Sequence, residues 1–176
     1  MTTTSFRRLA SVLVAGMLTL VSCQEPTSLV RHTPRPSLDL SSAPELLECP
    51  LPIASVGMAT IGTAGGTVTA GSSSIHIPPD ALLAPTAITI EESASAFVEV
   101  RITAGHAEHF EFEAPVTVTI GYSRCAPSAT ASADLGAWYI DDVTKALLEE
   151  MDATDDRGSR AVRFETGHLS SYAVAH

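Results

Sequence analysis

Basic residues are scarce in this chain of 176 residues, which has one lysine, Lys145, and ten Lys and Arg residues against twenty Asp and Glu. The formal net charge at pH 7 is −10. Proteins that bind nucleic acid neutralise backbone phosphates with clustered Lys and Arg side chains. The composition therefore excludes nucleic acid as an expected partner. Charged residues make up only 17% of the chain and hydrophobic residues 45%, which favours a folded domain over disorder throughout.

Catalytic and cofactor-binding motifs are also lacking. No G-x-S-x-G nucleophile elbow occurs, and Gly65 and Gly66 open a predicted strand without the lysine that a phosphate-binding loop requires. Two acidic groups contain residue types that bind metal ions, but neither has the spacing of a zinc or calcium site. We interpret both as solvated polar segments: His106, Glu108, His109, Glu111 and Glu113, and separately Asp152, Asp155 and Asp156. The sequence thus predicts no metal, no cofactor and no enzyme acting on an external substrate.

The N-terminus has the features of an export signal. Arg7 and Arg8 precede an apolar run from Leu9 to Leu20 that is shorter than a typical membrane span. A positively charged start followed by a short apolar run is characteristic of a secretory signal peptide. We therefore exclude residues 1–22 from the fold.

The apolar run ends in Leu20-Val21-Ser22-Cys23. This tetrapeptide resembles the bacterial lipobox, where a signal peptidase cuts before a lipid-modified cysteine. The resemblance implies that Cys23 becomes the mature N-terminus with several acyl chains, enough for stable membrane anchoring. An ordinary cleaved signal peptide with a chance cysteine is the alternative. Gln24 stands where the inner-membrane retention signal of enteric bacteria has Asp, so we expect the outer membrane.

Residues 23–52 are predicted to form a tether between the lipidated cysteine and the domain. The segment is rich in Pro, Ser and Thr and shows no sustained period of 2 or 3.6 residues. Prolines favour extended polyproline II geometry, so the tether would space the domain from the membrane. Leu46 and Leu47 could instead form a helical turn or an edge contact with the domain.

The cysteine count points to a disulfide. If Cys23 carries lipid, Cys49 and Cys125 remain as an even pair in a compartment that permits disulfides. We predict that these two cysteines are joined. Two free buried thiols or a metal pair are the alternatives, and no CxxC or HxxxH spacing supports metal.

Alternating apolar and polar residues dominate the chain from residue 53 onward. Val98, Val100 and Ile102 alternate with polar residues, and so do Val116, Val118 and Ile120. A period of two is typical of strands with one face in a core. The same pattern or strand-forming composition marks further strands around Val68, Ile75–Ile77, Ile88–Ile90, Phe110–Phe112, Trp138–Ile140, Val162–Phe164 and Tyr172–Val174, with residues 126–136 as a loop. We predict an all-β antiparallel sandwich over residues 53–176.

One segment, Asp141–Met151, fits two structures. Val143, Leu147 and Met151 are spaced for one face of a helix. A hairpin is the other possibility, with strands at Trp138–Asp141 and Ala146–Met151.

The stretch from Gly65 to Ile90, GGTVTAGSSSIHIPPDALLAPTAITI, resembles the opening of the ZU-five domain. This β module occurs in ankyrins, netrin receptors and zonula occludens proteins, and also in secreted bacterial proteins. The resemblance extends from about Val56 to the end of the chain, and Asp80 stands where animal members usually have Gly. It implies a β-sandwich that mediates protein contacts. It also implies a strand, a polar turn and a second strand around residues 141–151, and for this reason we expect the hairpin there.

The segment from Gly167 to Val174 contains His168-Leu169-Ser170. It resembles the His-Phe-Ser motif at which some ZU-five proteins split themselves, and the His-Leu-Ser/Thr motif of self-cleaving adhesion receptors. On that analogy the Ser170 hydroxyl attacks the Leu169 carbonyl, with His168 as base. Such a reaction needs a strained peptide and an aligned hydroxyl. Otherwise His168 and Ser170 hydrogen-bond the turn into a final strand whose Tyr172 and Val174 point to the core, and this is the role we expect.

The expected protein is an exported lipoprotein, held at the membrane through Cys23. Its non-catalytic sandwich is expected to be a binding or structural module that contacts an unidentified envelope protein. A domain that cleaves itself between Leu169 and Ser170 is the alternative. A glycan-binding or metal-dependent surface module is a third class. It ranks last because aromatic residues make up only 5% of the chain.

Overall fold

A computed structural model describes residues 43–49, 54–105, 107 and 110–176. The predicted signal peptide, Cys23, most of the tether, His106, Glu108 and His109 lie outside the described residues. Within the described part, the elements in chain order are β1 (Ser55–Ile61), β2 (Gly66–Ala70), β3 (Ser73–Ile77), β4 (Thr86–Glu92), β5 (Glu99–Ala104), β6 (Phe110–Gly121), α1 (Pro127–Thr130), β7 (Gly136–Ile140), β8 (Leu147–Glu150), β9 (Ala153–Asp156), β10 (Ala161–Leu169) and β11 (Ser171–Ala175). No helix in this part is long and apolar enough to cross a bilayer.

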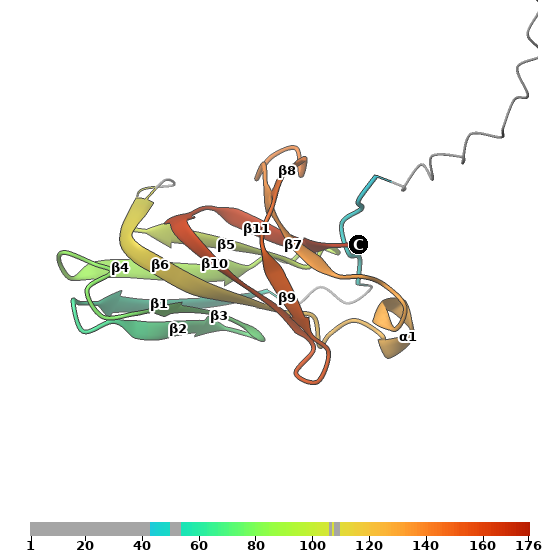
Figure 1. The fold of residues 1–176 in the computed structure, drawn as a ribbon, viewed down its shortest axis with the longest axis horizontal. Helices are drawn as coiled ribbons and strands as arrows, with labels where there is room; N and C mark the ends of the chain where they lie inside the picture. The colour runs from blue at the N-terminus through green and yellow to red at the C-terminus, as the bar shows by residue number, and fades with distance from the viewer. Residues whose placement is uncertain (1–42, 50–53, 106, 108–109) are drawn as a thin grey trace, which may run out of the picture. The chain divides into compact units, whose positions relative to one another are not determined.

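The strands form two antiparallel sheets that face each other (Figure 1). One sheet has six strands in the order β1-β4-β5-β11-β7-β8, and the other has five in the order β2-β3-β6-β10-β9. The edge strands of the six-stranded sheet are β1 and β8, and those of the five-stranded sheet are β2 and β9. Each edge strand of the first sheet is thus followed in the chain by an edge strand of the second. The predicted all-β sandwich is confirmed.

The core lies between the sheets and follows the predicted alternation. The Val and Ile residues of β5 and β6 are buried, Phe110 and Phe112 are half-buried, and Glu111 and Glu113 are exposed. Each buried Val or Ile side chain stabilises the fold by roughly 1.5–3 kcal/mol relative to an exposed position. The predicted core residues that are at most 3% exposed are Val68, Ile75, Ile77, Ile88, Ile90, Val98, Val100, Ile102, Val116, Val118, Ile120, Val162, Phe164, Tyr172 and Val174.

The ambiguous segment 141–151 is a hairpin, as expected. β7 and β8 pair antiparallel, with Trp138 opposite Glu150 and Tyr139 opposite Glu149. Val143, one of the residues spaced for a helix face, is 89% exposed in the turn. The predicted loop at 126–136 differs slightly, because it contains the single helical turn α1 and its last residue begins β7.

Residues 43–49, which we call the strap, lie on the sandwich beside the C-terminal end of β11 (Figure 1). Leu46 pairs with Ala175, and Glu48 pairs with Phe97. Leu47 is 2% exposed and belongs to the core. The last part of the predicted tether is therefore folded. Of the two alternatives considered for Leu46 and Leu47, the edge contact is the one that forms. The sandwich begins before residue 53 because a single buried leucine and strand pairing suffice to hold an otherwise polar segment.

Asp80 adopts a left-handed backbone conformation, with φ of 62°. Its N–H donates a hydrogen bond to the Thr63 carbonyl at 2.8 Å, which fixes the loop between β3 and β4. This conformation favours glycine and is tolerated by Asp and Asn. A glycine at this position would adopt the same conformation without strain.

We expect Asp80→Val to lower the free energy of unfolding by about 1–2 kcal/mol, because a β-branched side chain clashes in the left-handed region. Asp80→Gly is the matched control and should change stability by less than about 1 kcal/mol. Urea unfolding of both variants measures the difference. Equal effects of the two substitutions would show that the backbone conformation at residue 80 does not constrain the side chain.

Candidate functional site

The His168-Leu169-Ser170 motif lies where the chain crosses from one sheet to the other. Leu169 ends β10 and pairs with Phe110 in the five-stranded sheet. Ser171 begins β11 and lies between Arg101 and Ile140 in the six-stranded sheet. Ser170 alone makes the crossing, and its carbonyl accepts a hydrogen bond from the Ile102 N–H at 3.0 Å.

The His168 side chain packs among aromatic and hydroxyl groups. Its ring meets the Tyr139 ring edge-on, with 5.7 Å between centroids. Its Nδ1 lies 3.4 Å from Thr166 Oγ1, and its carbonyl accepts a hydrogen bond from the Tyr172 hydroxyl at 2.7 Å. Thr166 Oγ1 and the Tyr172 hydroxyl are 3.1 Å apart. These contacts close a buried hydrogen-bonded group around the turn into β11.

A cleavage reaction needs a base within hydrogen-bond reach of the nucleophile. Among the described residues, no hydrogen bond joins the His168 ring to the Ser170 hydroxyl. The non-glycine residues with positive φ in the described part are Asp80, Lys145 and Arg160, so the motif itself contains none. In this geometry the motif stabilises the crossing between the sheets, through its backbone hydrogen bonds and the packing of the His168 ring.

Burial raises the pKa of Tyr172 to about 12, since ionisation would place a charge in the core. The pKa of Tyr122 is also raised to about 12, first by burial and then by the 2.6 Å hydrogen bond that its hydroxyl donates to Asp155. An unfolded tyrosine ionises near pH 10. The neutral tyrosines thus stabilise the fold fully below pH 10, and this contribution is lost as the pH rises from 10 to 12.

We expect the free energy of unfolding to fall by about 2–3 kcal/mol per tyrosine between pH 10 and 12, because two pKa units correspond to that energy. Tyr172→Phe should remove about half of this pH dependence. Denaturant unfolding at pH 8, 10 and 12 measures it. A variant that keeps the full alkaline loss would contradict the assignment to Tyr172.

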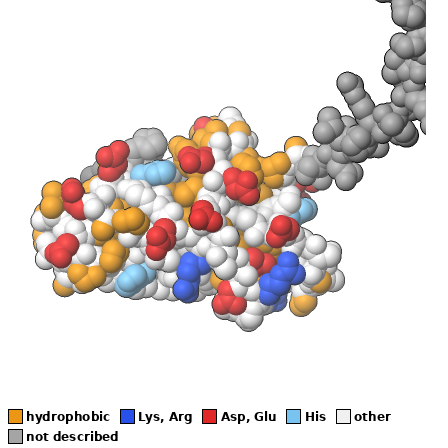
Figure 2. Space-filling model, viewed as in Figure 1, with side chains coloured by type: hydrophobic (Ala, Val, Ile, Leu, Met, Phe, Trp, Pro, Cys, Tyr) orange, Lys and Arg blue, Asp and Glu red, His pale blue; other side chains and the backbone are white. Residues whose placement is uncertain are grey.

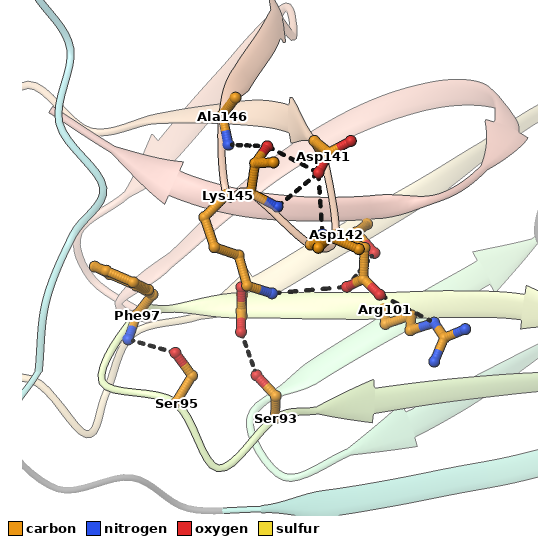
Figure 3. Close-up of polar contacts among 12 residues, drawn as sticks. Ser93, Ser95, Phe97, Arg101, Asp141, Asp142, Lys145 and Ala146 are labelled. Carbon is orange, nitrogen blue, oxygen red and sulfur yellow. Dashed lines mark hydrogen bonds and ion pairs between the residues drawn. The ribbon is translucent and has the colours of Figure 1, made fainter.

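The turn between β7 and β8 lies beside the crossing and is held by Asp141 (Figure 3). Asp141 Oδ1 accepts hydrogen bonds from the N–H groups of Val143 and Thr144, at 3.1 and 2.6 Å, and from the Thr144 hydroxyl at 2.8 Å. These hydrogen bonds, led by the Thr144 N–H, lower the pKa of the Asp141 carboxyl. The turn is therefore fixed locally, with Lys145 in a left-handed conformation at φ of 59°.

Lys145 reaches from this turn to β5. Its ammonium lies 2.9 Å from Glu99 Oε2 and 3.6 Å from Asp142 Oδ1 (Figure 3). Glu99 is only 7% exposed, and its other oxygen accepts a hydrogen bond from the Ser93 hydroxyl at 2.5 Å. Glu99 alternates with Val98 and Val100, a pattern that by itself favours an outward side chain. Its carboxylate is nevertheless buried, and the Lys145 ammonium supplies the partner that a buried charge needs.

Ser170 faces a hollow of about 250 Å³ on the six-stranded sheet. Its lining includes Arg101, Thr103, Tyr139, Ile140, Val143 and Ser171. The Ser171 hydroxyl donates to Asp142 at 3.2 Å, and Arg101 Nε lies 3.9 Å from the other Asp142 oxygen. Arg101, Asp142 and Ser171 at this hollow therefore have partners within the protein. In the described ranges, no group of three or more His, Cys, Asp or Glu side chains is placed to hold a metal ion.

Cys49 and Cys125 are joined by a disulfide, as predicted, with 4.9 Å between their Cα atoms. The bond connects the strap to the segment after β6. Nearby, Arg124 donates hydrogen bonds to the carbonyls of Ser95 and Phe97, at 3.1 and 2.5 Å. No local pattern indicates this use of Arg124, because it depends on loops that meet only in the fold.

No protein-family model matches this chain, and no curated protein matches it either. The resemblance to ZU-five domains stays a prediction from the residues between Gly65 and Ile90.

Proposed function

We propose that this chain is an exported lipoprotein, anchored through Cys23 at the outer membrane, whose ZU-five-like sandwich is a non-catalytic module that binds another protein at the cell envelope. The observation that carries the binding role is an apolar pair on the outer face of β1. Val56 is 63% exposed and Met58 is 71% exposed, two residues apart on an edge strand. Exposed apolar groups rimmed by polar residues favour protein contacts.

The surroundings of the pair fit a protein partner. Across the β1–β4 ladder, Glu91 lies opposite Val56 and Thr89 opposite Met58, which gives the apolar pair a polar border. Met is flexible and polarisable, and it adapts to irregular partner surfaces. Acidic side chains are scattered over the face drawn in Figure 2, and basic ones are few. We therefore expect a partner whose contact surface is apolar at its centre and basic around it.

Several charged side chains have structural roles, which favours a non-catalytic module. Arg124, Arg157 and Arg160 donate hydrogen bonds to main-chain carbonyls of loops. Glu92 accepts hydrogen bonds from Ser72 and Ser73, and so ties the β2–β3 turn to the end of β4. These contacts hold loops and turns of the sandwich together.

Site-specific photo-crosslinking in the producing cells tests the binding role. A photoreactive residue at position 58 should give one dominant crosslinked protein, and Val56→Asp should abolish it. Position 143 is the matched control, since Val143 is also exposed but lies on the turn after β7, on the far side of β4, β5 and β11 in the same sheet. Equal crosslinking from both positions, or none from position 58, would contradict the proposed surface.

Anchoring has its own test. Cys23→Ala should move the protein from the membrane fraction to the soluble fraction and remove the added mass of the acyl chains. Unchanged membrane association of this variant would contradict lipidation at Cys23.

Self-cleavage between Leu169 and Ser170 is the second candidate function. It is favoured by one observation, namely that Ser170 makes the sheet crossing alone and lines a hollow open to water. Ser170→Ala would abolish cleavage, and Ser171→Ala is the matched control. A product that lacks Ser170 to His176 would show that the chain cleaves itself and would assign catalytic roles to His168 and Ser170.

A further inference from the structure

The strap fills a gap in the six-stranded sheet. β5 and β11 pair from Arg101–Ser171 to Glu99–Ala173, and the Val174 N–H still donates to the Val98 carbonyl at 2.9 Å. The strap enters beyond that bond. The Leu47 N–H donates to the Val174 carbonyl at 2.8 Å, and the Leu47 carbonyl accepts from the Val98 N–H at 3.0 Å. Backbone bonds therefore join the strap to both neighbouring segments. It occupies the place of a short strand.

Further backbone bonds extend the pairing at both ends of the strap. The N–H and carbonyl of Glu45 both bond to His176, at 3.1 and 3.0 Å. The Cys49 N–H donates to the Ala96 carbonyl at 2.7 Å. Alternate residues of the strap thus supply five backbone hydrogen bonds, which is the pattern of an added strand.

Few side chains hold the strap in this gap. Leu47 and Cys49 are buried, Leu46 is half-buried, and the remaining strap residues are exposed. Next to the strap lies an open hollow of about 660 Å³, lined by Leu46, Phe97 and Leu147 among others. No described element covers this side of the strap, so its departure requires no other element to move. The Cys49–Cys125 disulfide is its only covalent attachment to the rest of the described sandwich apart from the chain itself.

Both walls of the gap are held without the strap. The Arg124 guanidinium bonds to the carbonyls of Ser95 and Phe97 and fixes the segment before β5. On the other side, β7 pairs with the end of β11, where Val174 lies opposite Ala137. An emptied gap would therefore keep its shape and present unpaired backbone groups along both walls. Such edges accept an extended strand from another chain.

We propose that this gap is a strand-addition site, closed within the chain by the Cys49–Cys125 disulfide and opened to the strap of a second copy when the disulfide is reduced. A dithiol reductant supplies two electrons and two protons, the S–S bond breaks to two thiols, and the reductant becomes its own disulfide. A second copy is the occupant because residues 43–49 already fit the gap. Leu47 enters the core, while Glu45 and Glu48 stay in water, so no charge is buried by the exchange.

Hydrogen exchange of the full chain, with and without dithiothreitol, tests the opening. In the reduced protein, the amides of Leu47 and Cys49 should exchange at least about 100-fold faster than amides of the β6–β10 ladder, because the strap opens without global unfolding. In the oxidised protein this ratio should be much smaller. Strap and ladder amides that exchange at one common rate after reduction would overturn the proposal.

Light scattering of the reduced full chain tests the occupant. We expect a dimer that forms as concentration rises, that Leu47→Asp abolishes, and that an excess of a peptide with the sequence of residues 43–48 dissociates. The Cys49→Ser, Cys125→Ser double variant should dimerise in the same way without reductant. A reduced protein that stays monomeric overturns the proposal, and so does a dimer that survives both the Leu47→Asp change and the peptide.

Discussion

Replacing Leu169 with alanine is expected to lower the free energy of unfolding by about 3 kcal/mol, within the range of about 2–5 kcal/mol for truncating a buried leucine. Leu169 is 0% exposed, belongs to the core between the sheets, and precedes the single residue that crosses them. Neighbouring strands cannot collapse into the space, because β10 is paired on its other residues with β6. Urea unfolding followed by circular dichroism measures the change.

Leu83→Ala is the matched control for this prediction. Leu83 is 81% exposed, so its truncation should alter stability by no more than about 0.5 kcal/mol. A Leu169→Ala variant as stable as the control would show that this part of the motif does not serve the core. A structural role for His168-Leu169-Ser170 at the crossing would then be contradicted.

Removing the disulfide should have an effect of similar size. Cys49 and Cys125 are 76 positions apart, and a loop of that length restricts the unfolded chain by about 4 kcal/mol in the chain-entropy model. We expect the Cys49→Ser, Cys125→Ser double variant to be less stable than the oxidised protein by about that amount. Denaturant midpoints with an unchanged slope would measure it as a stability change.

Reduction of the unmodified chain is the companion experiment. It should produce the same loss of stability as the double variant, while reductant should leave the double variant unchanged. A loss below about 1 kcal/mol would mean that the reduced chain is already restricted when unfolded. In that case the disulfide would contribute little to stability by restricting the unfolded chain.

Alternation along the chain was enough to predict most of the strands and most of the core, but not β1 or β9. Asp155 was expected in a solvated polar segment, and that prediction was wrong, because it lies in β9 with its side chain 10% exposed and accepts a hydrogen bond from the Tyr122 hydroxyl. Val116, Val118 and Ile120 are buried and their neighbours face outward, because a strand places successive side chains on opposite faces. The hairpin at 141–151 was expected from the resemblance to ZU-five domains, since its apolar spacing also fits a helix. The Asp141 hydrogen bonds to Val143 and Thr144 explain why a turn forms there.

Features that depend on contacts distant in sequence could not be predicted from local pattern. Glu99 looks like any outward residue of β5, and only the turn that carries Lys145 buries it. Leu47 lies in a proline-rich, aperiodic segment, and its burial depends on where β5 and β11 separate. Strand order and the splay of a sheet are global properties, so neither residue carries a local signal.

The candidate site shows the same division. Residue identity singled out His168, Leu169 and Ser170, and the fold places them at the crossing between sheets. Identity alone could not give the direction of the His168 ring, which contacts Tyr139 and Thr166. Whether three residues form a reactive site depends on their mutual geometry, and that geometry is set by the surrounding strands.

The intact mass of the purified full chain, measured under denaturing conditions with and without reductant, tests the central claim of an anchored, non-catalytic module most directly. Our account predicts one species that begins at acylated Cys23, ends at His176, and gains the mass of two hydrogens on reduction. A species that lacks Ser170 to His176 in the unmodified chain and in Ser171→Ala, but not in Ser170→Ala, would contradict it and establish self-cleavage.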